Sequence, residues 1–143
     1  MALEQLTYTS TAVKDFGELE LSRLLLQARR NNERSTITGL LLYHERSFLQ
    51  VLEGEGGVID TVFARIERDE RHTRVSVLVR QPVPARQFAD WAMGFVAAKR
   101  IADTLPGFSD FLQHRGDPTR ARGLATSILA KFRDGEYRAV VER

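Results

Sequence analysis

The order of strand-like and helix-like apolar patterns is the feature of this sequence that most restricts its fold. Apolar runs at residues 37–43 and 48–52 and strand-like patterns at residues 3–10, 74–80 and 91–96 predict five strands. Helical spacing predicts one helix after the first strand and a second at residues 59–66. The resulting order, β-α-β-β-α-β-β, is typical of a ferredoxin-like sandwich. We therefore predict an α+β fold with a mixed five-stranded sheet and two helices on one face.

Short local signals indicate where these elements begin and end. Only residues 44–47 separate the second strand from the third, so the two should pair as a hairpin. Asp15 and Glu18 have the spacing of a capping box, which predicts the start of the first helix. Asn31 and Asn32 follow two arginines and tolerate a left-handed cap, so we expect the helix to end there.

The end of the chain predicts two further helices. One is short and begins near residue 107, and the other presents an apolar stripe from Leu124 to Phe132. This segment is too small to form a core of its own. We therefore divide the chain into a domain at residues 1–98 and a helical extension at 99–143 that packs on the open face of the sheet, without a separate output domain. An alternative is that the apolar stripe contacts another copy of the chain.

Composition excludes several classes of protein. The 143 residues contain no cysteine, which excludes disulfide scaffolds, thiolate metal sites and thiol catalysis. The three histidines lie far apart, without the spacing of metal ligands. A formal net charge of +2 gives no support for nucleic-acid binding. No apolar run reaches the roughly 18 residues of a transmembrane helix, and the first residues lack a signal-peptide pattern, so we predict a cytoplasmic protein.

Common catalytic and nucleotide-binding motifs are also missing. The sequence has no GxGxxG fingerprint, no phosphate-binding loop with its lysine and no GxSxG elbow. The glycine-rich stretch at residues 54–57 is a poor phosphate cradle because Glu53 and Glu55 would repel anions. An acid–base hydrolase built on Asp69 and His72 would need a nucleophile, and the sequence identifies none near them.

Two polar residues lie in the middle of predicted strands. Alternation puts Gln50 on the same face as Phe48 and Leu52, where an amide without a partner would cost about 1–3 kcal/mol. Tyr8 lies in the middle of the first strand. If the two strands are neighbours, the phenol and the carboxamide can form a donor–acceptor pair, because an amide offers both functions. The alternative is that Gln50 is exposed or bonded to backbone and that Tyr8 is an ordinary core residue.

Further residues have a structural and a functional interpretation. Arg65 and Asp69 are spaced as an ion pair on the second helix. Trp91 and Met93 share one face of the predicted fifth strand, where they are ordinary core residues. Together, the amides, the phenol and the Arg–Asp pair would suit a planar heterocycle rich in carbonyl and ring-nitrogen acceptors.

Six short segments occur in an order and spacing that is specific when they are taken together. They are LTYTS at 6–10, NN at 31–32, ITGLLLY at 37–43, FLQVLEG at 48–54, DERH at 69–72 and WAMGF at 91–95. Together they resemble the BLUF family of blue-light sensors that use FAD, over about residues 3–97. The tail at residues 128–137 is similar to that of the short stand-alone members of this family, which lack an output domain.

The resemblance implies a flavin between the two helices, over the sheet. The residues implied to bind it are Tyr8, Asn31, Asn32, Gln50, Arg65, Ile66, Asp69, Arg71 and His72. In the family pattern Tyr8 gives an electron and a proton, and Gln50 relays between the phenol and the flavin. Trp91 and Met93 belong to a mobile fifth strand that reports the change. The implied cofactor is FAD, with FMN and riboflavin as alternatives.

The implied function is that of a blue-light photoreceptor without enzymatic activity. The resemblance implies signalling to an unidentified protein partner and self-association into a homo-oligomer. The net charge and the apolar pattern predict neither nucleic acid nor a membrane as a partner. The alternative is a flavin-free ferredoxin-like module that uses the sheet and the C-terminal helices to dimerise or to bind another protein.

Overall fold

The computed structural model describes residues 2–97, 107–134 and 141 of the chain. Its elements in chain order are β1 (Leu3–Ala12), α1 (Glu18–Ser35), β2 (Thr38–His44), β3 (Ser47–Glu55), α2 (Gly56–Glu67), β4 (His72–Pro82), β5 (Gly94–Ala97), α4 (Phe108–Gln113) and α5 (Pro118–Arg133). Up to β5 this is the order that the apolar periodicities predicted.

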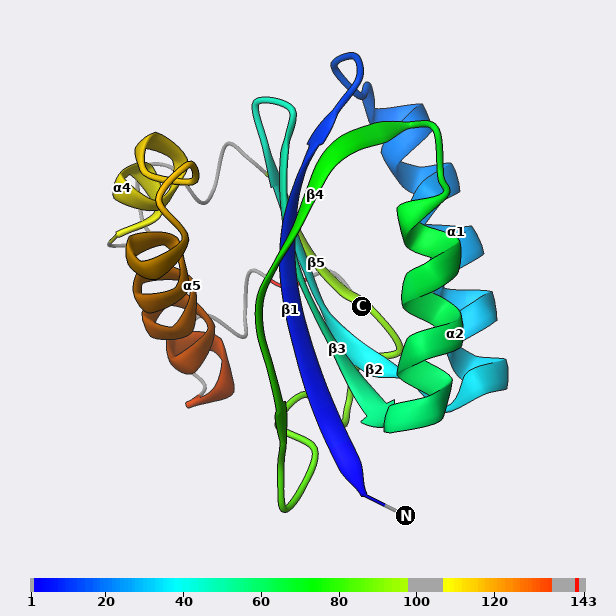
Figure 1. The fold of residues 1–143 in the computed structure, drawn as a ribbon. Coiled ribbons are helices and arrows are strands. Elements are labelled where there is room, and N and C mark those ends of the chain that lie inside the picture. Colours follow the sequence, from blue (N-terminus) through cyan, green and yellow to red (C-terminus); the bar gives the residue numbers. More distant parts are fainter. Residues whose placement is uncertain (1, 98–106, 135–140, 142–143) are drawn as a thin grey trace.

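The five strands form one mixed sheet in the order β4-β1-β3-β2-β5. Neighbouring strands are antiparallel, except that β2 and β5 are parallel. Figure 1 shows α1 and α2 on one face of the sheet and α4 and α5 on the other. The predicted ferredoxin-like α+β sandwich is therefore confirmed, including the place of the C-terminal helices.

Each face of the sheet has its own hydrophobic core. Tyr8 on β1 and the β3 residues Phe48 and Leu52 belong to the core shared with α1 and α2. Leu49 and Val51 on β3 point the other way, into the core shared with α4 and α5. A polar residue that alternates with the first set, such as Gln50, is therefore enclosed between the sheet and the helices α1 and α2.

The β2–β3 hairpin is tighter than predicted. Only Glu45 and Arg46 lie outside the paired strands, and both have positive φ angles, of 45° and 66°. Two consecutive residues with positive φ give the turn a twist that matches the twist of the flanking strands. The hairpin prediction is confirmed, and both strands extend further into the loop.

Helix α1 begins and ends differently from the prediction. Asp15 does not cap the helix, because its Oδ1 accepts a hydrogen bond from the Tyr43 hydroxyl at 2.8 Å. The helix continues through Asn31 and Asn32 to Ser35, and Thr36 caps it in the left-handed conformation with φ of 56°. The predicted capping box and the predicted cap at the two asparagines are therefore wrong, since Asp15 and Asn32 make tertiary hydrogen bonds instead and the helix continues past both asparagines.

The fifth strand is shorter than predicted, because Trp91 and Met93 precede it in a bent segment. Trp91 belongs to the core on the side of α4 and α5, whereas Met93 belongs to the core on the side of α1 and α2. The prediction that the two side chains share one face is wrong. Side chains two positions apart lie on the same face only while the backbone is extended, and here it is not.

The apolar stripe of α5 packs on the sheet. Asp117 caps this helix by accepting a hydrogen bond from the Arg120 backbone N–H at 3.3 Å. Ile128, Leu129 and Phe132 are buried in the core that includes β2 and β3 residues. The alternative of a stripe left free for another copy is therefore wrong for these three residues. Like the other helices within the described ranges, α5 is not long and apolar enough to cross a membrane.

Candidate functional site

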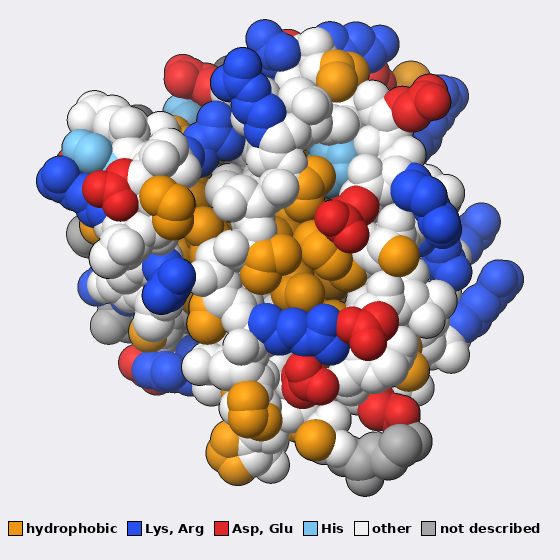
Figure 2. All heavy atoms as spheres, in the orientation of Figure 1, with side chains coloured by type: hydrophobic (Ala, Val, Ile, Leu, Met, Phe, Trp, Pro, Cys, Tyr) orange, Lys and Arg blue, Asp and Glu red, His pale blue; other side chains and the backbone are white. Residues whose placement is uncertain are grey.

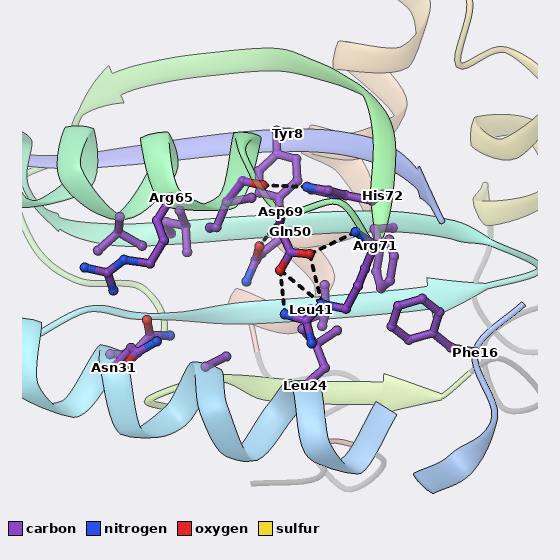
Figure 3. A pocket seen from close by; sticks show the side chains of 16 residues that line it. Tyr8, Phe16, Leu24, Asn31, Leu41, Gln50, Arg65, Asp69, Arg71 and His72 are labelled. Carbon is purple, nitrogen blue, oxygen red and sulfur yellow. Dashed lines mark hydrogen bonds and ion pairs between the residues drawn. The ribbon is translucent and has the colours of Figure 1, made fainter. Parts of the chain in front are cut away.

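A pocket lies between α1, α2 and the face of the sheet that carries Tyr8 and Gln50 (Figure 3). It holds about 700 Å³ of space, its opening to solvent included. Apolar side chains form much of its wall: Phe16, Leu24, Ala28, Leu41, Phe48, Leu52, Val62 and Ile66. The polar lining residues are Tyr8, Asn31, Asn32, Gln50, Arg65, Asp69, Arg71 and His72. Every residue that the sequence assigned to a bound flavin thus lines this one pocket.

The register of the sheet brings Tyr8 and Gln50 together. They lie directly opposite each other on β1 and β3, and only 4% and 6% of their surfaces are exposed. The Tyr8 hydroxyl donates a hydrogen bond to Oε1 of Gln50. Burial raises the pKa of the Tyr8 phenol above its ordinary value, and the negative charge of Asp69 raises it further. The phenol therefore keeps its proton at neutral pH, and the predicted donor–acceptor pair is present.

The other end of the Gln50 carboxamide faces Met93. Nε2 of Gln50 donates to the Met93 sulfur at 3.3 Å, and a thioether is a weak acceptor. Trp91 lies on the far side of the sheet, stacked on Phe88 with ring centroids 5.9 Å apart. Neither Trp91 nor Met93 is among the residues that line the pocket. Met93 is therefore the residue of this segment that touches the Tyr8–Gln50 pair.

The segment before β5 is also tied to α1. Nδ2 of the buried Asn32 donates to the Ala92 carbonyl at 2.7 Å, and Nε of Arg29 donates to the Met93 carbonyl at 3.0 Å. One N–H of the Asn32 amide is therefore bonded within the protein, and its second N–H is available to a ligand. Asn31 is half-buried and lines the pocket, and within the described residues its side chain has no hydrogen-bond partner.

The predicted ion pair between Arg65 and Asp69 does not form. Helix α2 ends at Glu67, so Asp69 lies beyond it, where its Oδ1 accepts hydrogen bonds from the backbone N–H and Nε of Arg71, both at 2.9 Å. These bonds hold the pKa of the Asp69 carboxyl below its usual value. The exposed Arg65 guanidinium has no partner among the described residues, and Figure 3 shows it at the same end of the pocket as Asn31.

His72 is bonded at both ring nitrogens. Nε2 lies 2.6 Å from the Ile66 carbonyl and Nδ1 lies 2.8 Å from Oγ of Ser10. A carbonyl only accepts, so Nε2 carries a proton, and in the neutral ring Nδ1 accepts from the serine hydroxyl. The sequence analysis did not associate the Ser10 hydroxyl with His72. A hydrolytic triad would also need a carboxylate bonded to the histidine, and the Asp69 carboxylate pairs with Arg71 instead. Across the described ranges, no cluster of acidic and histidine side chains could hold a metal ion.

The structural role of one buried carboxylate outside the pocket was missed by the sequence analysis. Glu53 is fully buried, and its two carboxylate oxygens accept hydrogen bonds from the backbone N–H groups of Gln87 and Phe88, at 2.7 and 2.8 Å. The side chains of Gln5 and Thr38 donate to it as well, at 3.0 and 3.1 Å. Glu53 therefore fastens the loop between β4 and β5, which leads to Trp91 and Met93. A charge in a strand gives no local signal of such a distant partner.

Replacing Glu53 with glutamine should loosen this loop. One amide oxygen remains as an acceptor, and the amide nitrogen cannot accept from a backbone N–H, so one buried donor loses its partner at a cost of about 1–3 kcal/mol. We expect a lower melting temperature and a red-shifted emission of Trp91, the only tryptophan in the chain. Glu55→Gln, two residues along the same strand and partly exposed, is the control. Unchanged stability and emission in Glu53→Gln would contradict the anchoring role.

The free hydrogen-bonding groups of the pocket fit the edge of a flavin ring. The flavin ring system is planar and apolar on its faces and carries carbonyl and ring-nitrogen groups along one edge. Aliphatic side chains from α1, α2 and the sheet supply the apolar walls. Asn31, Asn32, Gln50 and Arg65 supply N–H groups that are unpaired or weakly paired within the described part of the chain. Such a set binds and orients a heterocycle and contains no paired nucleophile and base aimed at a substrate.

Comparison with curated proteins finds relatives that respond to light. The family model described as "Sensors of blue-light using FAD" matches residues 3–94. The photoactivated adenylate cyclase subunit beta of Euglena longa is 34% identical over 111 residues, which are 77% of this chain but only 13% of that protein. The chain thus spans about an eighth of the length of that relative, which is much larger.

Solved structures give the same result. The dark-state structure of BlrB, a BLUF protein, superposes with a TM-score of 0.73 at 30% identity, covering 88% of this chain and 97% of that one. A structure of Klebsiella pneumoniae BlrP1 with FMN and cyclic diGMP superposes with a TM-score of 0.67 at 27% identity, covering 94% of this chain and 35% of that one. With the family model matching well over half of its length, the chain belongs to the BLUF family, the sensors of blue light using FAD.

Proposed function

We propose that this chain is a blue-light photoreceptor in which Tyr8 and Gln50 form the light-responsive pair beside a flavin bound in the pocket between α1 and α2. The observation that carries the proposal is the hydrogen bond from the buried Tyr8 hydroxyl to Gln50, whose other amide end faces only a weak acceptor. The flavin-free alternative expected Gln50 to be exposed or bonded to backbone, and it is neither.

The pocket residues divide into holding and reacting groups. Asn31, Asn32 and Arg65 would donate to the polar edge of the ring, and Ile66 would flank its face. Asp69, Arg71 and His72 would line the outer end of the pocket, where Asp69 and Arg71 form a fixed ion pair. When bound, a flavin supplies a chromophore that absorbs blue light and becomes a strong oxidant on excitation. FAD is the flavin that the family description names.

The chemistry of this chain is then a reversible transfer at one phenol. Tyr8 would give one electron to the bound flavin after excitation, and its phenolic proton would move along the hydrogen bond to Oε1 of Gln50. Both return to Tyr8, so no group is consumed and the oxidation states are restored. Gln50 is left rotated or in another tautomer, because its carboxamide can exchange donor and acceptor ends. A changed hydrogen-bond pattern is therefore the product, and we propose that the chain itself carries no enzymatic activity.

The structural change at Gln50 is passed on first to Met93. A reoriented Gln50 no longer directs Nε2 at the Met93 sulfur, and Met93 lies in the segment that Asn32, Arg29 and Glu53 also hold. This segment is a two-state element that Gln50 can bias. We propose a protein partner or another copy of the chain as the receiver, with residues 1–98 as the sensing unit and 99–143 as its extension. The relatives joined to a cyclase support signalling to an effector.

An absorption spectrum in darkness and then under blue light tests the proposal. The purified protein should be yellow, and blue light should shift the flavin band to longer wavelength in a way that reverses in the dark. Released chromophore identified by chromatography would name the flavin. A colourless protein that does not take up FAD, FMN or riboflavin would overturn the proposed function.

A further inference from the structure

A second hollow adjoins the pocket on the outer flank of α1. Its lining residues are Arg23, Leu26, Gln27, Arg30, Asn31 and Arg34. Asn31 lines the hollow and the pocket alike. Gln27 accepts a hydrogen bond from Nη2 of Arg71 at 3.3 Å, and Arg71 is itself part of the pocket wall. The hollow therefore begins at the edge of the pocket, on the side that faces solvent.

Three arginine side chains at this hollow have no ion-pair partner among the described residues. Arg23, Arg30 and Arg34 are exposed, and none forms an ion pair or a hydrogen bond with another residue of the described ranges. Arg30 and Arg34 lie one helical turn apart, a spacing at which like charges destabilise a helix. Attraction to the helix dipole accounts for Arg34 in the last turn, but not for Arg23 in the middle of α1. An anion seated among these side chains would relieve the repulsion.

The opposite rim of the pocket is positive as well. Arg65 on α2 is exposed and has no partner among the described residues, and the nearby carboxylate of Asp69 is neutralised by Arg71. Figure 2 shows Lys and Arg side chains projecting on the right, where Figure 1 places α1 and α2. Because the pocket opens to solvent, the side chain of a ring held in it would have to leave through this opening. Guanidinium groups bind phosphate through forked, charge-assisted hydrogen bonds.

We infer that the hollow lined by Arg23, Arg30 and Arg34 binds the phosphate of a flavin nucleotide, so that the chain selects FMN or FAD over riboflavin. The inference rests on the proposed function, because it needs the ring to lie in the pocket. The three flavins share that ring and differ in what the opening must accommodate. Riboflavin lacks the phosphate, FMN has one, and FAD has two.

Titration of the flavin-free full chain with riboflavin, FMN and FAD tests the inference, with quenching of flavin fluorescence as the readout. We expect FMN and FAD to bind about tenfold more tightly than riboflavin, as a few charge-assisted bonds at an exposed site would give. In Arg23→Gln/Arg30→Gln this preference should fall to about twofold or less, with riboflavin affinity unchanged. Raising the salt concentration should weaken FMN binding but not riboflavin binding, because exposed charges are screened.

Arg120→Gln/Arg133→Gln on α5, across the sheet, removes the same charge and should leave the preference intact. Equal affinities for all three flavins in the unmodified chain would overturn the inference and leave the proposed function standing. A preference that persists in Arg23→Gln/Arg30→Gln would also overturn it, and would assign these arginines to something else, such as an acidic protein partner. If none of the three flavins binds, the proposed function fails and the inference fails with it.

Discussion

Tyr8→Phe is expected to bind flavin and remain yellow, but to show none of the light-induced red shift. Phenylalanine keeps the ring that packs on Phe63 at a centroid distance of 5.4 Å, so the pocket should keep its shape. It lacks the hydroxyl that donates to Gln50, so the pair loses its proton donor and its readily oxidised group. The absorption spectrum before and after illumination measures the effect, and the loss should be complete.

Tyr43→Phe is the matched control for this substitution. Tyr43 is also a buried tyrosine whose hydroxyl is bonded, in this case to Asp15 and to the backbone N–H of Phe16 at 3.0 Å, but it does not line the pocket. It should lose stability by a similar amount and keep the full red shift. A normal photocycle in Tyr8→Phe would show that another residue supplies the electron and the proton.

Gln50→Leu is expected to lose the red shift as completely as Tyr8→Phe. Leucine fills a similar volume but offers neither an acceptor for the Tyr8 proton nor a carboxamide that can exchange its ends. The buried Tyr8 hydroxyl also loses its partner, which should lower the free energy of unfolding by about 1–3 kcal/mol. Light-minus-dark spectra and thermal denaturation report the two effects separately.

Gln5→Leu is a control on the neighbouring strand. Gln5 is as buried as Gln50, but its amide donates to Glu53 and Gln87 on the other side of the sheet. It should be destabilised and still photoactive. Normal photochemistry in Gln50→Leu would show that the relay assignment is wrong. If Tyr8→Phe had nevertheless lost its red shift, another residue of the pocket would be the acceptor of the Tyr8 proton.

The sequence was informative wherever a residue's face follows from a regular backbone. Alternation within β3 set Gln50 beside Phe48 and Leu52, and the structure confirms this face. The strand order then makes Tyr8 the direct neighbour of Gln50. The roles of the pocket residues came from the family resemblance, and the structure shows that these residues share one pocket.

The sequence was misleading wherever a backbone ends or bends. Asp69 has helical spacing from Arg65, but α2 ends before it, and Arg71 is the nearer cation. Trp91 and Met93 were assigned one face because the strand was extended too far back along the chain. These errors share a cause. Periodicity describes residues within an element, and it contains no information on the contacts that decide where the element stops.

By itself, the sequence determined the order of the elements and the face on which each strand residue lies, because these depend on side-chain periods set by local backbone geometry. Only the tertiary structure decided that Glu53 holds the loop before β5, that Met93 rather than Trp91 touches Gln50, and that the arginine-rich flank of α1 is joined to the pocket wall through Gln27 and Arg71. Each of these depends on bringing together residues far apart in the chain, through contacts for which a single sequence has no periodic pattern.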